Sequence, residues 1–180
     1  MSTDISETKN ADQIAAATTG VRPPADLTLW MELQELQARY AHAIDSDDIE
    51  AWPGYFTEDA QYTILSRENA ERGLPAPILW CRNAAMMRDR VVALRNANIY
   101  EEHRYRHATS GLIITSVDGD TVTTESSYIV IRTGQAGNAE VYSAGSYHDT
   151  VVKTDQGWRY AERKVIYDTS RVLTLLATPI

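Results

Sequence analysis

Residues 106–168 decide the fold, and they read RHATSGLIITSVDGDTVTTESSYIVIRTGQAGNAEVYSAGSYHDTVVKTDQGWRYAERKVIYD. Apolar and polar side chains alternate through this stretch, and short turns rich in Gly, Asp and Asn interrupt it. Alternation of this kind is typical of strands, and such turns join neighbouring strands as antiparallel hairpins. The sequence therefore predicts a four-stranded antiparallel meander, with strands at about 106–116, 121–132, 140–154 and 158–168.

The third of these strands has no purely apolar face. One face carries Tyr147 and Val151 among polar residues, and the other carries Tyr142 and Val152 among Ser, Thr and His. This mixture favours a strongly curved sheet that is covered on both sides. Gly145, in mid-strand, predicts a bulge or a bend.

A helix is expected before the sheet. Asp26 can cap it, and its apolar side chains recur every three or four residues up to Asp45: Leu29, Leu33, Leu36, Tyr40 and Ile44. A short second helix should run from residues 46–48 through Trp52, where Pro53 interrupts it.

A first strand is expected near residues 60–65, followed by a long ordered loop at 66–81, where Gly73, Pro75 and Pro77 disfavour a regular element. Helices followed by an antiparallel meander make an α+β fold. We expect a cone-like curved antiparallel sheet packed on the N-terminal helices.

The segment 86–107 combines a basic helix with a cluster of Tyr, Arg and His. Met87, Val91, Leu94 and Asn98 follow the spacing of one helical face, and residues 100–107 read YEEHRYRH. Tyr and Arg are enriched at protein interfaces, which favours a contact with a partner. A solvated loop with local ion pairs explains the composition equally well.

The composition limits the classes of function. A chain of 180 residues with 43% hydrophobic residues fits one domain, and a net charge of −8 makes nucleic acid a poor partner. The lone Cys81 excludes an internal disulfide and favours the cytosol. Residues 1–25 resemble neither a signal peptide nor a membrane span, and they predict a flexible arm ahead of a single domain at 26–180.

Several runs of the sequence carry a family resemblance. The run YAHAIDSDDIEAWPGYFTEDAQYTI (40–64) resembles the opening of nuclear transport factor 2-like, or cystatin-like, cone folds. The runs SRENAERGLP (66–75), RDRVVALRNANIYEEHRYRH (88–107) and ERKVIYDTS (162–170) resemble the small (β) subunits of Rieske non-haem iron aromatic-ring-hydroxylating dioxygenases. The resemblance extends over roughly residues 29–180, and it is nearest to subunits that serve aromatic carboxylates of the terephthalate, salicylate or anthranilate type, with terephthalate 1,2-dioxygenase foremost.

The resemblance implies a non-catalytic subunit that supports assembly. Three small and three large subunits would form an α3β3 complex, and the large subunits would hold a two-iron Rieske cluster and a mononuclear Fe(II). Electrons would come from NADH through a reductase. No cofactor is expected in this chain, since a Rieske centre needs two Cys and two His.

The four histidines predict no metal site. His42 should point outward from the first helix, and His148 has no evident partner. His103 and His107 are four residues apart, which suits a metal pair only on a helix, and the chain is expected to leave the helix before Tyr105.

Two other classes of function stay open. Similar cone folds include dehydratases and isomerases, and a stand-alone acid–base enzyme could use Asp45, Tyr40 and His107, with Tyr62 and Tyr147, in one apolar pocket. A ligand-binding scaffold without catalysis is the other class. For the assembly role, the residues expected to contact a partner are Trp80, Arg90, Arg104, Tyr105, Arg106 and His107.

Overall fold

The computed structural model describes residues 26–74, 76–96, 102–169 and 178–180. Its elements follow one another as α2 (Leu27–Asp45), η1 (Ile49–Tyr55), β1 (Phe56–Ser66), α3 (Arg67–Glu71), β2 (Leu79–Cys81), α4 (Ala84–Asn96), β3 (His103–Asp118), β4 (Thr121–Gly134), β5 (Ala139–Thr154) and β6 (Gly157–Tyr167). The predicted arm at 1–25 and the predicted face residue Asn98 lie outside the described residues. The division into an arm and one domain therefore stays a prediction.

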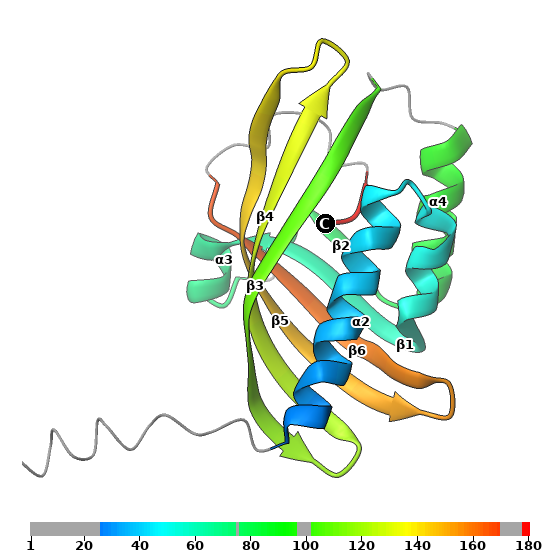
Figure 1. Cartoon of the computed structure of the whole chain (residues 1–180), viewed down its shortest axis with the longest axis vertical. Helices are drawn as coiled ribbons and strands as arrows, with labels where there is room; N and C mark the ends of the chain where they lie inside the picture. The colour runs from blue at the N-terminus through cyan, green and yellow to red at the C-terminus, as the bar shows by residue number, and fades with distance from the viewer. Residues whose placement is uncertain (1–25, 75, 97–101, 170–177) are drawn as a thin grey trace, which may run out of the picture.

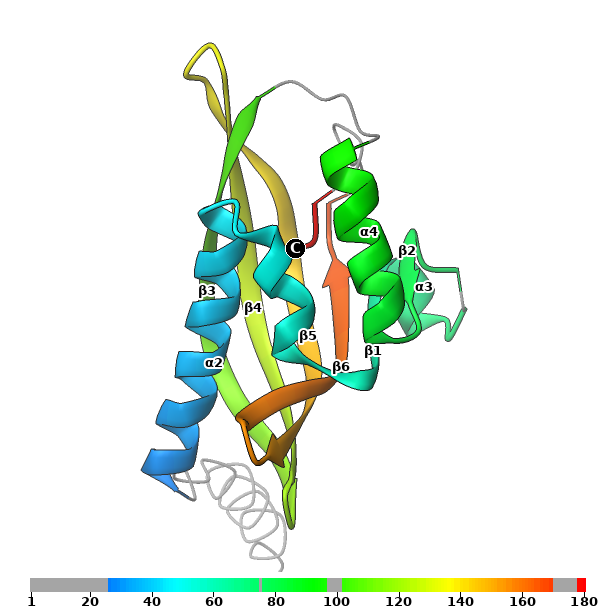
Figure 2. The same cartoon turned by 90° about the vertical axis from the view of Figure 1, so that its right-hand side faces the viewer.

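The six strands form one curved sheet with the order β2-β1-β6-β5-β4-β3 (Figure 1). The antiparallel meander from β3 to β6 is confirmed. The first strand is longer than predicted, and it pairs in parallel with β6, so the sheet is not wholly antiparallel. The α+β class is correct. The helices α2, η1 and α4 lie along the concave side of the sheet (Figure 2).

Two of the predicted helices, α2 and α4, form for the expected reason. The second helix differs from its prediction: η1 is a 3-10 helix that extends through Pro53 to Tyr55 instead of ending at Trp52, and Asp48 makes no side-chain capping hydrogen bond. The Asp26 side chain accepts hydrogen bonds from the backbone N–H groups of Thr28 and Leu29, at 2.8 and 3.3 Å, and so caps α2. The buried face of α2 contains Leu33, Leu36, Tyr40 and Ile44. The buried face of α4 contains Met87, Val91 and Leu94. Both apolar stripes are therefore confirmed.

Residues 66–81 correct one prediction. Instead of a continuous loop, they contain the short helix α3, capped by Ser66, and the three-residue strand β2. Strand β2 pairs with β1, and Leu79 and Cys81 are buried there. A strand this short is stabilised by its pairing with β1 rather than by local propensity. The sequence did not predict it, because the Gly and Pro residues around it are typical of a loop.

Gly145 lies at no bulge, which corrects one of the two roles predicted for it. The register runs without a shift through Gly145, which pairs with Tyr128 and Tyr167. A Cβ atom there would lie 1.9 Å from the carbonyl oxygen of Ile166, so close approach of the backbone, and not a bulge, requires this glycine. A glycine at a bulge is found instead in β3, where Gly111 has a φ of 65°.

Among the described residues, no helix is long and apolar enough to cross a membrane.

Candidate functional site

The C-terminal end of α2 is bound to β3 through an aspartate–histidine pair. The Asp45 carboxylate accepts hydrogen bonds from the backbone N–H of His107, at 2.9 and 3.1 Å, and lies 2.6 Å from its Nδ1 atom. The two side chains are 5% and 0% exposed. Nδ1 is the donor if the carboxylate is ionised, and Nε2 of His107 is buried and has no hydrogen-bond partner among the described residues. This pair has the arrangement of an acid–base dyad.

The tyrosines that could assist such a dyad lie elsewhere. The hydroxyls of Tyr40 and Tyr62 each donate to the backbone oxygen of Ile180, at 2.9 Å. Tyr40 also accepts from Trp52 Nε1, and Tyr62 accepts from the Ile180 N–H. Burial raises the pKa of both phenols, so they stay neutral. Ile180, the last residue of the sequence, thus occupies the concave side of the sheet between them.

A buried ion pair fills the next part of the interior. Arg163 Nε and Nη2 donate to the two carboxylate oxygens of Asp149, at 3.0 and 2.7 Å, and Nη2 also donates to Tyr160. The guanidinium lies 4.0 to 4.3 Å from the ring centroids of Tyr40, Tyr147 and Tyr160. Burial alone would lower the pKa of Arg163, but the Asp149 carboxylate raises it well above its usual value. The guanidinium therefore stays charged.

A pocket of about 780 Å³ lies at the C-terminal end of α2. Its polar lining includes Asp45, Asp47, Glu102, His103 and Arg104. Tyr40, Tyr62, Tyr147 and His107 do not line it. Of the five residues considered for an acid–base pocket, this pocket is therefore lined by Asp45 alone.

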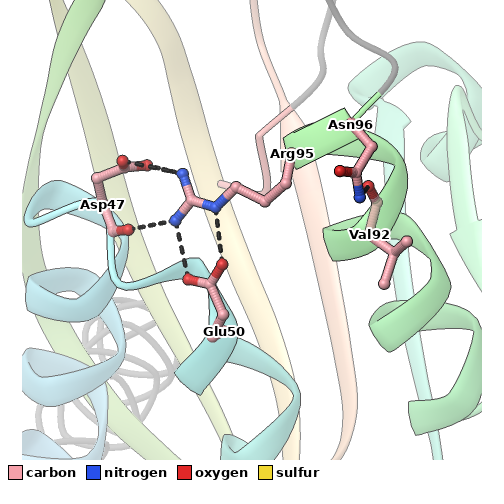
Figure 3. A network of polar contacts seen from close by, with 5 residues as sticks. All are labelled: Asp47, Glu50, Val92, Arg95 and Asn96. Carbon is pink, nitrogen blue, oxygen red and sulfur yellow. Dashed lines mark hydrogen bonds and ion pairs between the residues drawn. The ribbon is translucent and has the colours of Figure 1, made fainter.

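An arginine network includes Asp47, one of the residues that line this pocket (Figure 3). Arg95, in the last turn of α4, binds the Asp47 carboxylate with Nη1 at 2.9 Å and the Glu50 carboxylate with Nε and Nη2 at 2.7 and 2.8 Å. Nη2 also donates to the Asp47 carbonyl oxygen. These hydrogen bonds lower the pKa of Glu50 to about 2. The network joins α4 to the turn between α2 and η1.

The predicted partner contacts divide into exposed and buried side chains. Trp80 is 41% exposed and lies 4.3 Å from the guanidinium of Arg82. Arg104 and Arg106 are exposed on β3, and Arg90 is half-buried. For these four residues a contact with a partner stays a prediction.

The other two predicted contacts face the interior. Tyr105 is 7% exposed and packs against the rings of His103 and Tyr142, at 4.6 and 5.2 Å between centroids. The His107 side chain is fully buried against Asp45. Both residues can support the surface of β3, but their side chains offer no area to a partner.

The histidines do not converge. His42 is exposed, as predicted, and lies 3.5 Å from the Ser46 hydroxyl. His148 lies 3.5 Å from Glu125, a neighbour that the sequence did not reveal. Across the described part of the chain, no group of three His, Cys, Asp or Glu residues could hold a metal ion.

Sequence reasoning missed Asp149 and Arg163. A charged residue in a strand is usually read as facing solvent, and nothing local identifies its partner on another strand. The alternation of side chains along the strands could have identified them as buried. Asp149 shares a face with Tyr147 and Val151, and Arg163 shares a face with Val165.

Comparison with known proteins gives consistent matches. Residues 25–164 match the SnoaL-like domain family. The chain is 55% identical over 155 residues to the anthranilate 1,2-dioxygenase small subunit of Burkholderia cepacia, covering 86% of this chain and 96% of the relative. It is 37% identical to the terephthalate 1,2-dioxygenase terminal oxygenase component subunit beta 2 of Comamonas sp., covering 83% and 97%.

A solved structure agrees with these relatives. The β subunit of a candidate aromatic-ring-hydroxylating dioxygenase from Novosphingobium aromaticivorans superposes with a TM-score of 0.77 and 41% identity, covering 83% of this chain and 95% of that chain.

Proposed function

Because the chain belongs to the small (β) subunits of aromatic-ring-hydroxylating dioxygenases, we propose that it does no chemistry itself and supports the assembly of the catalytic large subunits. In this role it positions neighbouring large subunits so that electrons from one can reach the iron of the next. Three copies of each subunit, as α3β3, are the proposed stoichiometry, and the cytosol is the proposed compartment.

The observation that carries this proposal is the occupied interior of the cone. The backbone oxygen of Ile180 accepts hydrogen bonds from the hydroxyls of Tyr40 and Tyr62, and the Asp149–Arg163 ion pair lies among tyrosine rings. Most polar groups of the interior are thus bonded to one another, although the Tyr147 hydroxyl and His107 Nε2 have no hydrogen-bond partner among the described residues. Acid–base catalysis needs such groups within reach of a bound substrate. The filled interior supports a structural role.

The cofactors of the complex do not fit this chain. A Rieske cluster needs two Cys and two His, whereas the sequence has one Cys, and Cys81 is buried. We therefore assign the Rieske cluster and the mononuclear Fe(II) to the large subunit, with electrons supplied by NADH through a reductase.

We propose an aromatic carboxylate as the substrate of the complex. Anthranilate and terephthalate, in the names of the two relatives, are both benzene rings that carry carboxylate groups. The identity to the anthranilate relative is higher than that to the terephthalate relative, 55% against 37%, so anthranilate is the first substrate to test.

Affinity purification of the tagged chain from its native cells tests this function. We expect a larger partner in equal copy number, identified by mass spectrometry and native mass, with Rieske-type absorbance and iron in the eluate. With reductase and NADH, the complex should hydroxylate anthranilate, whereas the chain alone should not. A colourless homodimer, or turnover by the chain alone, would overturn the proposal.

The Asp45–His107 pair is the specific observation that favours a second candidate, a stand-alone dehydratase or isomerase. Such an enzyme would be active without iron, and Asp45→Asn would abolish its activity while leaving the fold intact. If the small-subunit function is right, Asp45→Asn changes stability or assembly only, and the purified chain catalyses no reaction.

A further inference from the structure

Exposed apolar side chains gather on the outer face of the sheet, where β3, β4 and β5 run side by side. In the strand register, Ile131 of β4 lies between Arg106 of β3 and Val141 of β5. Ile129 lies two residues away along β4, and Arg104 lies two residues away along β3. Ile129, Ile131 and Val141 are 44%, 36% and 54% exposed. We name these five residues the outer patch.

The outer patch lies on the uncovered side of the sheet. The residues that alternate with it, Tyr105, Tyr128 and Val130, are buried, so the members of the patch point away from the core. The helices α2, η1 and α4 lie on the opposite, concave side (Figures 1 and 2). Among the elements that the structure describes, no helix approaches the backbone of β4 or β5.

The two arginines of the outer patch are unlike most exposed arginines of this chain. Arg67, Arg88 and Arg95 each bind a carboxylate at 2.7 to 3.1 Å. Within the described part of the chain, Arg104 and Arg106 have no ion-pair partner. Unpaired guanidiniums beside exposed isoleucine and valine combine the features enriched in protein interfaces. Their charge complements a partner with carboxylates around an apolar surface.

Helix α2 contacts the edge of β3 that pairs with no other strand. A partner is therefore expected on the outer face of the sheet rather than at this edge. Strand β3 ends the sheet, and its unpaired backbone groups could otherwise accept another strand. At one point the His107 N–H binds Asp45, and at another the Leu112 carbonyl accepts from Trp30 Nε1 at 3.1 Å. Both contacts come from α2, so α2 obstructs strand addition.

We propose that the outer patch is the surface on which the large subunit docks, through a partner surface that presents carboxylates around an apolar centre. This inference rests on the function proposed above. A second copy of this chain, docked patch to patch, is the less suitable occupant, because the contact would bring Arg104 and Arg106 of both copies together.

The test measures the dissociation constant between this chain and the separately purified large subunit identified by the affinity purification. The variants are Val141→Glu, Arg106→Glu and Arg106→Lys. The matched control is Ile113→Glu, because Ile113 is 56% exposed on the same sheet but lies outside the patch. Circular dichroism verifies that each variant folds.

We expect Val141→Glu and Arg106→Glu to raise the dissociation constant about tenfold or more, because both place a carboxylate against an acidic partner. Arg106→Lys keeps the positive charge that complements the partner and should bind within about threefold of the parent chain, as should the Ile113 control. Equal binding by all variants would overturn the outer patch while leaving the proposed function intact.

Two other results separate the remaining possibilities. If the parent chain binds no large subunit, the proposed function fails and the assigned occupant fails with it. If Val141→Glu abolishes self-association of this chain but binds the large subunit normally, the occupant is a second copy and the inference is overturned.

Discussion

Replacing Asp149 by Asn should destabilise the chain strongly. The substitution nearly preserves the volume of the side chain but leaves the Arg163 charge uncompensated, in a site where the two side chains are 3% and 0% exposed. It weakens two hydrogen bonds of 2.7 and 3.0 Å, and the Tyr160 hydroxyl remains as a neutral partner. Breaking a buried ion pair at one end costs about 3 to 5 kcal/mol. That is a large part of the roughly 5 to 15 kcal/mol that stabilises a typical domain.

Urea unfolding followed by circular dichroism measures this loss, and an exposed pair provides the matched control. Arg88 binds Glu58 with the same two-bond geometry, at 3.1 and 2.8 Å, but the side chains are 51% and 81% exposed. Glu58→Gln should therefore hardly move the unfolding midpoint, because water solvates both charges. If Asp149→Asn and Glu58→Gln shift the midpoint equally, burial of the ion pair is not the cause and the reasoning is refuted.

The double variant Asp149→Leu/Arg163→Met separates charge from packing. It removes both charges and keeps apolar volume, so it should recover much of the stability that Asp149→Asn loses. A double variant as unstable as Asp149→Asn would show that the cost lies in the packing of the tyrosine rings around Arg163.

Three further changes follow from the structure. Gly145→Ala should destabilise the chain by more than about 3 kcal/mol in urea unfolding, because the new Cβ atom would collide with the backbone of β6. Gly54→Ala is the control and should be nearly neutral, because a Cβ atom at Gly54 would meet no atom within 4 Å. Similar unfolding midpoints for the two variants would contradict this. Asp45→Ala should cost about 1 to 3 kcal/mol by leaving a β3 backbone N–H without its acceptor, and faster amide exchange at that position is the measurement. Arg95 lowers the pKa of the Glu50 carboxyl from 4.5 to about 2. The ion pair therefore stabilises the fold fully above about pH 4.5, and this stabilisation is lost as the pH falls towards 2. The difference in urea midpoint between the parent chain and Glu50→Gln should shrink over this interval, and a constant difference would refute the assignment.

The sequence predicted the parts of the fold that repeat locally. The apolar stripe of α2 and the alternation of β3 to β6 recur over many residues, so each element could be assigned without knowing its neighbours. The parallel pairing of β1 with β6 joins segments about a hundred residues apart, and no local pattern carries it. Strand β2 is three residues long and exists because β1 pairs with it.

The sequence predicted which residues could belong to a polar site, but not how these residues lie relative to one another. Asp45, His107, Tyr40, Tyr62 and Tyr147 were considered for the alternative acid–base pocket, and His107 was also expected to contact a partner; the side chains of all five are buried. Asp45 and His107 meet each other, whereas Tyr40 and Tyr62 meet separately, at the backbone oxygen of Ile180. All five were considered for one pocket because composition does not tell which end of a curved sheet a residue occupies.

The contacts around the C-terminal end of α2 explain how a cone with a filled interior can still serve a complex. Asp45 binds β3 through His107, and Asp47 binds α4 through Arg95, so one end of one helix holds two other elements in place. The start of β3, which carries Arg104, is thereby fixed by buried and charge-assisted contacts. A rigid surface loses little conformational entropy when a partner binds it. Polar groups that in an enzyme would face a substrate here hold the surface that we assign to the large subunit.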